Sequence, residues 1–77
     1  MKWNHRIVDM TEANGGEPLL ALREVFYDDD EVPTSHGEPS VMSENMEGLK
    51  WCIKEMQSAL KQPILKPDDF NLRGGRA

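Results

Sequence analysis

The most regular apolar pattern in the chain lies between residues 43 and 61. Its apolar side chains recur every three or four residues, at Met46, Leu49, Ile53, Met56 and Leu60. That spacing places them on one face of an α-helix, in a stripe about 80° wide. Two small residues, Cys52 and Ala59, border the stripe on one side. Long polar side chains border it on the other side, at Lys50, Lys54, Gln57 and Lys61. The pattern predicts an amphipathic helix that packs through this stripe.

The expected ends of this helix follow from its flanking residues. Ser43 can act as the N-cap, because its hydroxyl can accept a hydrogen bond from a free amide of the first turn. Pro63 disfavours helical geometry in the residue before it, so we expect the helix to stop near Lys61. Gly48 costs about 1 kcal/mol relative to alanine inside a helix, which indicates that another group packs closely against that turn.

Trp51 does not belong to the apolar stripe. It projects from the opposite, polar face of the expected helix. A large indole at such a position either stacks on a ligand or needs a cover, and two covers are open. One is the chain's own C-terminal segment or sheet edge. The other is a partner or a second copy, since tryptophan is enriched at interface hot spots.

Three further segments have the composition of β-strands. Residues 3–10 and 19–27 are rich in β-branched and aromatic side chains, and residues 32–36 follow as a shorter strand. Residues 11–17 contain Asn-Gly-Gly and predict a turn, and the acidic run 28–31 predicts a second, solvated turn. Segment 19–27 also has partial helical spacing, but its Val-Phe-Tyr ending favours a strand. The expected fold class is α+β: a three-stranded antiparallel meander with one helix, residues 43–61, on one face.

This expected architecture leaves apolar surface uncovered. Both faces of the strand at 19–27 are apolar, whereas one helix covers only one face of a sheet. Exposed apolar patches usually mark interaction sites, so we expect a homodimer that buries the second sheet face or pairs edge strands. The candidate partner-binding residues are Trp3, Leu19, Val25, Tyr27 and Trp51. Residues 1–70 are expected to form one small domain, followed by a disordered tail at 71–77.

Charge and composition narrow the classes of partner. Of the chain's nine Lys and Arg, two lie after residue 70, so residues 1–70 carry seven basic and fourteen acidic side chains. Such a balance disfavours direct binding to nucleic acid or to acidic membranes. A single cysteine allows no internal disulfide. Neither a signal peptide nor a membrane-spanning segment is evident, so a cytoplasmic location is expected.

The chain contains no residue set with recognisable chemistry. The acidic run 28–31 lacks the alternating ligand spacing of a calcium loop. His5, His36 and Cys52 are the only imidazole and thiol groups, and their scattered positions do not fit a zinc site. Cys52 lies in mid-helix beside the apolar stripe, where a thiol is normally inert. We therefore expect no metal, no cofactor and no enzymatic activity.

A resemblance to known proteins rests on the hairpin and the helix. The run LREVFYDDDEVP followed by LKWCIKEMQSALKQPIL resembles small bacterial proteins of unassigned function, over residues 19–65. They have a β-hairpin, one amphipathic helix and a Pro-Ile/Val-Leu ending. The topology also resembles, more weakly, the truncated RNase H-like domain of HicB-type antitoxins. This chain differs from that domain in lacking an evident Gly-rich entry to the helix and an evident fourth strand after it.

Three functions follow as hypotheses. The first is a non-enzymatic interaction or accessory module that acts as a homodimer. The second, implied by the antitoxin likeness, is an acidic inhibitor of a basic partner. The third is a small enzyme or ligand-binding protein whose site forms between two copies, with His5 or His36 beside a carboxylate.

Overall fold

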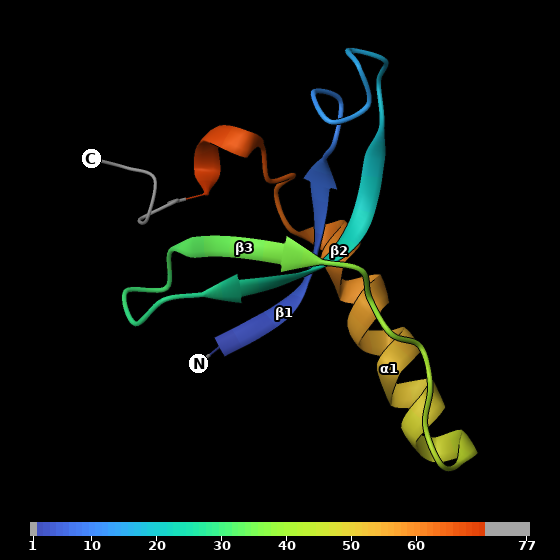
Figure 1. Cartoon of the computed structure of the whole chain (residues 1–77). Helices are drawn as coiled ribbons and strands as arrows, with labels where there is room; N and C mark the ends of the chain where they lie inside the picture. The colour runs from blue at the N-terminus through green and yellow to red at the C-terminus, as the bar shows by residue number, and fades with distance from the viewer. Residues whose placement is uncertain (1, 71–77) are drawn as a thin grey trace.

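The computed structural model describes residues 2–70 and contains one sheet and one α-helix (Figure 1). Strands β1 (Lys2–Asp9), β2 (Leu20–Tyr27) and β3 (Pro33–Gly37) form an antiparallel sheet in the order β1-β2-β3. Helix α1 (Met46–Ser58) continues into a 3-10 turn, η1 (Ala59–Lys61), and a second 3-10 turn, η2 (Pro67–Asp69), follows. The expected α+β fold is confirmed. The tail predicted at 71–77 lies outside the described residues.

Local chemistry explains both hairpin turns. Gly15 and Gly16 adopt φ angles of 69° and 92° between β1 and β2, a region that glycine enters without steric cost. In the acidic turn the Asp28 carboxylate accepts hydrogen bonds from the amides of Asp30 (2.8 Å) and Val32 (3.0 Å). Asp28 thus holds its own turn, as aspartate commonly does, while Asp29 and Asp30 are exposed.

The N-cap of helix α1 lies two residues later than predicted. The prediction of Ser43 as the N-cap is wrong: the Asn45 side chain accepts the Gly48 amide at 2.8 Å. Asparagine caps a helix at least as well as serine. Asn45 lies immediately before Met46, the first residue of the apolar pattern, and it takes the capping position. A Cβ placed on Gly48 would overlap Ser43 Oγ. The close neighbour expected at Gly48 is therefore Ser43.

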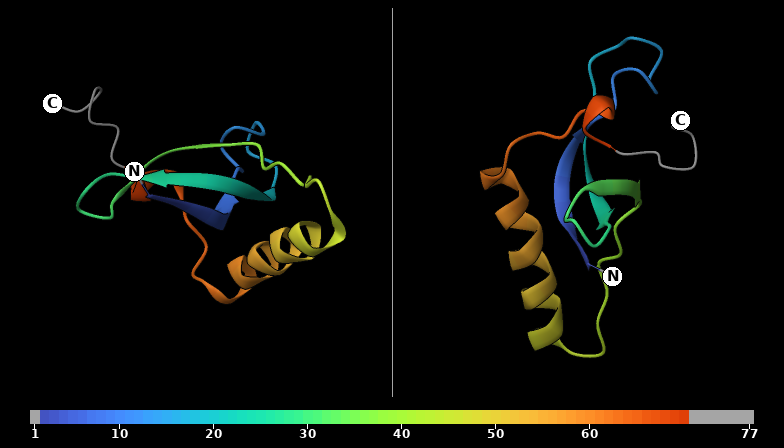
Figure 2. Two further views of the ribbon diagram at one scale, coloured as in Figure 1. Left: turned by 90° about the horizontal axis from the view of Figure 1, so that it is seen from below. Right: turned by 90° about the vertical axis from the view of Figure 1, so that its left-hand side faces the viewer.

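The sheet has α1 on one side and the C-terminal segment on the other (Figure 2). Strand register places Trp3, His5 and Ile7 of β1 on the same face as Leu22 and Phe26 of β2. The helix lies on this side and packs against β1. Of its residues only Met56 is buried, together with Ala59 in η1. The helix is thus attached mainly through its C-terminal half.

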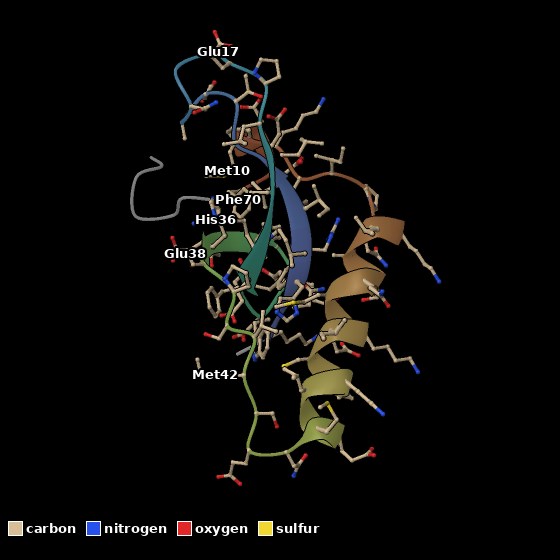
Figure 3. All side chains as sticks on the ribbon, turned by 90° about the vertical axis from the view of Figure 1, so that its right-hand side faces the viewer. Met10, Glu17, His36, Glu38, Met42 and Phe70 are labelled. Carbon is tan, nitrogen blue, oxygen red and sulfur yellow. The ribbon has the colours of Figure 1, made fainter. Side chains whose placement is uncertain are left out.

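The main buried cluster lies on the sheet face away from α1. It consists of Val8, Val25 and Leu65, with Met10, Tyr27 and Phe70 packed against it. Met10 and Phe70 lie across the sheet from the helix (Figure 3). The expectation that this second face is uncovered is therefore wrong in part. The segment after the helix folds back over it and supplies Leu65 and Phe70.

This returning segment, residues 63–70, is called the C-terminal strap below. The Leu65 amide donates to the Ile7 carbonyl at 2.9 Å, and the Asp9 amide donates to the Leu65 carbonyl at 2.7 Å. Leu65 thereby forms a single parallel bridge with Val8. The Arg6 guanidinium adds a hydrogen bond to the Pro63 carbonyl at 2.7 Å. The strap occupies the position of a fourth strand beside β1, which the sequence did not reveal.

Two leucines five residues apart test this account of the core. Leu65 is 8% exposed and Leu60 is 73% exposed. We expect Leu65→Ala to lower the free energy of unfolding by about 2–5 kcal/mol, because it leaves a cavity over Val8 and Val25. Leu60→Ala should change it by less than about 0.5 kcal/mol. Urea unfolding measures both values, and equal losses would contradict the described core.

Candidate functional site

Three of the five residues of the predicted apolar stripe are left exposed. Met46, Ile53 and Leu60 are 63%, 44% and 73% exposed, and they recur every seven residues along one line of the helix. These three residues are called the spare stripe below. Met56 is buried and Leu49 is half-buried. The prediction that the whole stripe packs inward is therefore wrong.

The flank of small residues decides which way the helix faces. Ala59 is fully buried and Cys52 is half-buried, so the packed face is turned toward the side that they occupy. Small side chains let the helix backbone approach β1 closely, where the longer Leu60 and Ile53 would hold it away. The expectation that Cys52 packs as a small apolar group agrees with its half-buried position, and its reactivity stays a prediction.

The candidate partner-binding residues fall into two groups. Trp51, Trp3 and Leu19 are exposed, and Trp51 has no cover within residues 2–70, at 58% exposure. Val25 is wrong as a partner-binding residue, because its side chain is completely buried in the core cluster. Tyr27 is half-buried and packs against the same cluster.

Tyr27 and Trp3 do meet at one place on the surface. They line a shallow cavity of ≈ 620 Å³ with Lys2, Asn4, Arg6 and Glu31. The Tyr27 hydroxyl donates to the Asn4 side chain at 2.7 Å and accepts from Arg6 at 3.2 Å. Lys2 and Glu31 form an ion pair of 2.6 Å at its rim. Most of these polar groups satisfy one another, although Arg6 Nε has no hydrogen-bond partner among the described residues, so the cavity offers a partner mainly the indole of Trp3.

A second cavity lies under the C-terminal strap, on the sheet face away from α1. Its volume is ≈ 520 Å³, and its lining includes His36, Phe70, Met10, Asp9 and Glu12. Figure 3 shows His36, Phe70 and Met10 together on this side of the sheet. The His36 and Phe70 ring centroids are 5.0 Å apart. This cavity is called the His36 cavity below.

Arg23 determines which ring nitrogen of the neutral His36 carries the proton. Its Nε donates to His36 Nδ1 at 2.9 Å, so the ring proton of the neutral imidazole lies on Nε2. Burial, and secondarily the charge of Arg23, lower the pKa of His36. Hydrogen bonds from the Thr11 side chain and backbone lower the pKa of Asp9. At neutral pH the cavity therefore contains a neutral imidazole and an ionised carboxylate.

The arrangement is suited to binding more than to acid–base catalysis. A carboxylate cannot orient His36 through Nδ1, because Arg23 already occupies that nitrogen. His5 is buried on the other side of the sheet, where its Nε2 has no hydrogen-bond partner among the described residues. The two histidines are thus not brought together. Within residues 2–70 no three His, Cys, Asp or Glu side chains are grouped as metal ligands.

Comparison of the chain with protein-family models, with curated proteins and with solved structures found no match. In the described part of the chain, no helix combines the length and the apolar character needed to cross a membrane.

The pKa of His36 provides a test of the cavity. Since folding lowers this pKa from its ordinary value of 6.5, the folded state disfavours protonation. The resulting stability is present above pH 6.5 and is lost as the pH falls through and below that value. We expect an NMR titration of the imidazole to show a midpoint below 6.5. Phe70→Ala should raise the pKa more than Arg23→Met, because burial is the larger cause. A wild-type midpoint at or above 6.5 would show that the ring is fully solvated.

Proposed function

We propose that this chain is a non-enzymatic interaction module that works as a homodimer and binds a protein partner through exposed apolar surface. The observation that carries the proposal is the imbalance between buried and exposed apolar side chains. Among the described residues five hydrophobic side chains are buried, and ten large ones are exposed. Large exposed apolar patches are rare on proteins that act alone.

The distribution of the exposed side chains supports a binding role. Single exposed apolar residues are normal on any surface. Here, however, Met46, Ile53 and Leu60 form a line along the helix, and Ile64 follows at the start of the strap. Trp51 is exposed on another face of the same helix. Because tryptophan and aligned aliphatic residues anchor protein interfaces, α1 is the element best suited to hold a partner.

The free edge of β3 supports association of two copies. Leu65 bridges the outer edge of β1 at Val8, whereas no segment within residues 2–70 forms a bridge with the outer edge of β3. Such an edge presents unpaired backbone donors and acceptors. Antiparallel pairing of β3 with β3 of a second copy would satisfy them symmetrically and would join the two sheets.

This arrangement makes a prediction about oligomeric state. At tens of micromolar, light scattering should give the mass of a dimer. Hydrogen exchange of the outward amides in residues 34–37 should slow as the protein concentration rises, because a partner strand protects them. The Asp9 amide serves as the internal control, since it already donates to the Leu65 carbonyl within each subunit. A monomer at these concentrations would remove the homodimer.

The position of the strap supports a second candidate, an antitoxin-like inhibitor. The HicB-type likeness calls for a fourth strand after the helix, and Leu65 lies beside β1 in that position. The acidic body of this chain would hold a basic partner, with the exposed Asp29 and Asp30 among its contacts. Co-expression with a small basic protein encoded next to this chain tests it. A complex weakened by D29N and D30N supports the candidate, and failure to form any complex excludes it.

A further inference from the structure

Positive charge in this acidic chain is concentrated beside the spare stripe. Residues 1–70 contain seven Lys and Arg, and three of these, Lys50, Lys54 and Lys61, lie on α1 and η1. At about 100° per residue they fall on one side of the helix, next to Met46, Ile53 and Leu60. The other side of the spare stripe faces the chain's own sheet, through Leu49, Met56 and Ala59. The stripe is therefore bordered by lysines on its open side.

These lysines have no charged partner within the described residues. The ion pair found within residues 2–70 joins Lys2 and Glu31, away from α1. All three helix lysines are exposed. Lys50 and Lys54 are four residues apart on one helix, where like charges are destabilising by about 0.2–0.5 kcal/mol. Glu47, three residues before Lys50 on the same helix, offsets part of this repulsion within the subunit, and an acidic group placed beside Lys54 and Lys61 would relieve the rest.

The same charges argue against a second copy on this surface. Two α1 helices packed antiparallel through their spare stripes would bring the lysine side of one helix against the lysine side of the other. Like charges placed opposite each other disfavour such a pairing. The occupant of the spare stripe should instead combine apolar residues at helical spacing with Asp or Glu beside them.

We propose that the spare stripe, with Lys50, Lys54 and Lys61, is the docking surface for an acidic amphipathic helix of another protein. This inference rests on the proposed interaction function and specifies the chemistry of the partner. Apolar side chains of the partner helix pack against Met46, Ile53 and Leu60, in the helix-on-helix mode of coiled coils. Its carboxylates pair with the three lysines and fix its direction and register.

Two synthetic peptides test the charge requirement. Both have three heptads with leucine at the two core positions, and they differ only in carrying Glu or Lys at the flanking positions. Fluorescence anisotropy of the labelled peptides with the full chain measures their affinities. We expect the Glu peptide to bind about tenfold more tightly than the Lys peptide in dilute buffer. This difference should disappear near 1 M salt, where the Debye length is about 3 Å.

Matched variants locate the binding surface. K54E should reverse part of the preference between the two peptides, whereas K66E, a charge reversal on the strap, should not. I53S should weaken the Glu peptide about tenfold, the loss expected for a buried aliphatic anchor. L20S, a change at an exposed apolar residue at the start of β2 and away from α1, should leave its affinity unchanged. Circular dichroism of each variant confirms that the helix and sheet persist.

Each outcome separates this inference from the function on which it rests. Equal binding of both peptides, sensitive to I53S, would retain an interaction module and overturn the acidic partner. Binding that is unaffected by I53S and K54E would overturn the docking surface. Self-association lost in I53S, without peptide binding, would assign the stripe to a second copy. Absence of both peptide binding and dimer formation would reject the interaction module as well.

Discussion

The two backbone hydrogen bonds between Leu65 and β1 hold the remainder of the molecule in place. They join Leu65 to the backbone of Ile7 and Asp9 and so bring the Leu65 side chain over Val8. Without them the core cluster would lose one of its three buried members. Phe70 and η2 would no longer cover the sheet, and the C-terminal end of α1 would be attached only through Met56 and Ala59. A small domain has few buried contacts to lose, so this single bridge has a large structural effect.

The bridge also determines how the apolar surface is divided. Because the strap supplies a cover for one sheet face, the helix is not required to close the main core. It can pack through its small residues and leave Met46, Ile53 and Leu60 at the surface. The same residues that would complete the core of a more compact domain are here available to another molecule. The His36 cavity has a related origin, since Phe70 of the strap forms one wall of it.

Regular periodicity made the fold predictable. The strand ending Val25-Phe26-Tyr27 and the three-four spacing of α1 are local signals, and both elements form where they were expected. The face through which the helix packs was not predictable. Ala59 and Cys52 add little hydrophobicity to the pattern, yet their small side chains permit the closest approach of the helix to β1. The strap was missed for a different reason. The bridge at Leu65 depends on pairing with Val8, which is distant in the sequence. The short segment around Pro63 has no periodic apolar pattern that would predict a strand. Val25 was misjudged for the same reason, since its cover comes from the far end of the chain.

The position of Leu65 has a consequence for how the protein is made. Val8 and Leu65 are bridged across nearly the whole length of the chain, and contacts of such high sequence separation form slowly. During translation the hairpin of β1 and β2 leaves the ribosome long before Leu65 has been added. Until then its apolar face has no cover, and exposed strands of this kind are prone to aggregate. A transcript that ended before the Leu65 codon would therefore yield a hairpin and a helix whose core cluster lacks one of its three buried members, and the quality-control proteases of the cell would meet a chain with exposed apolar strands.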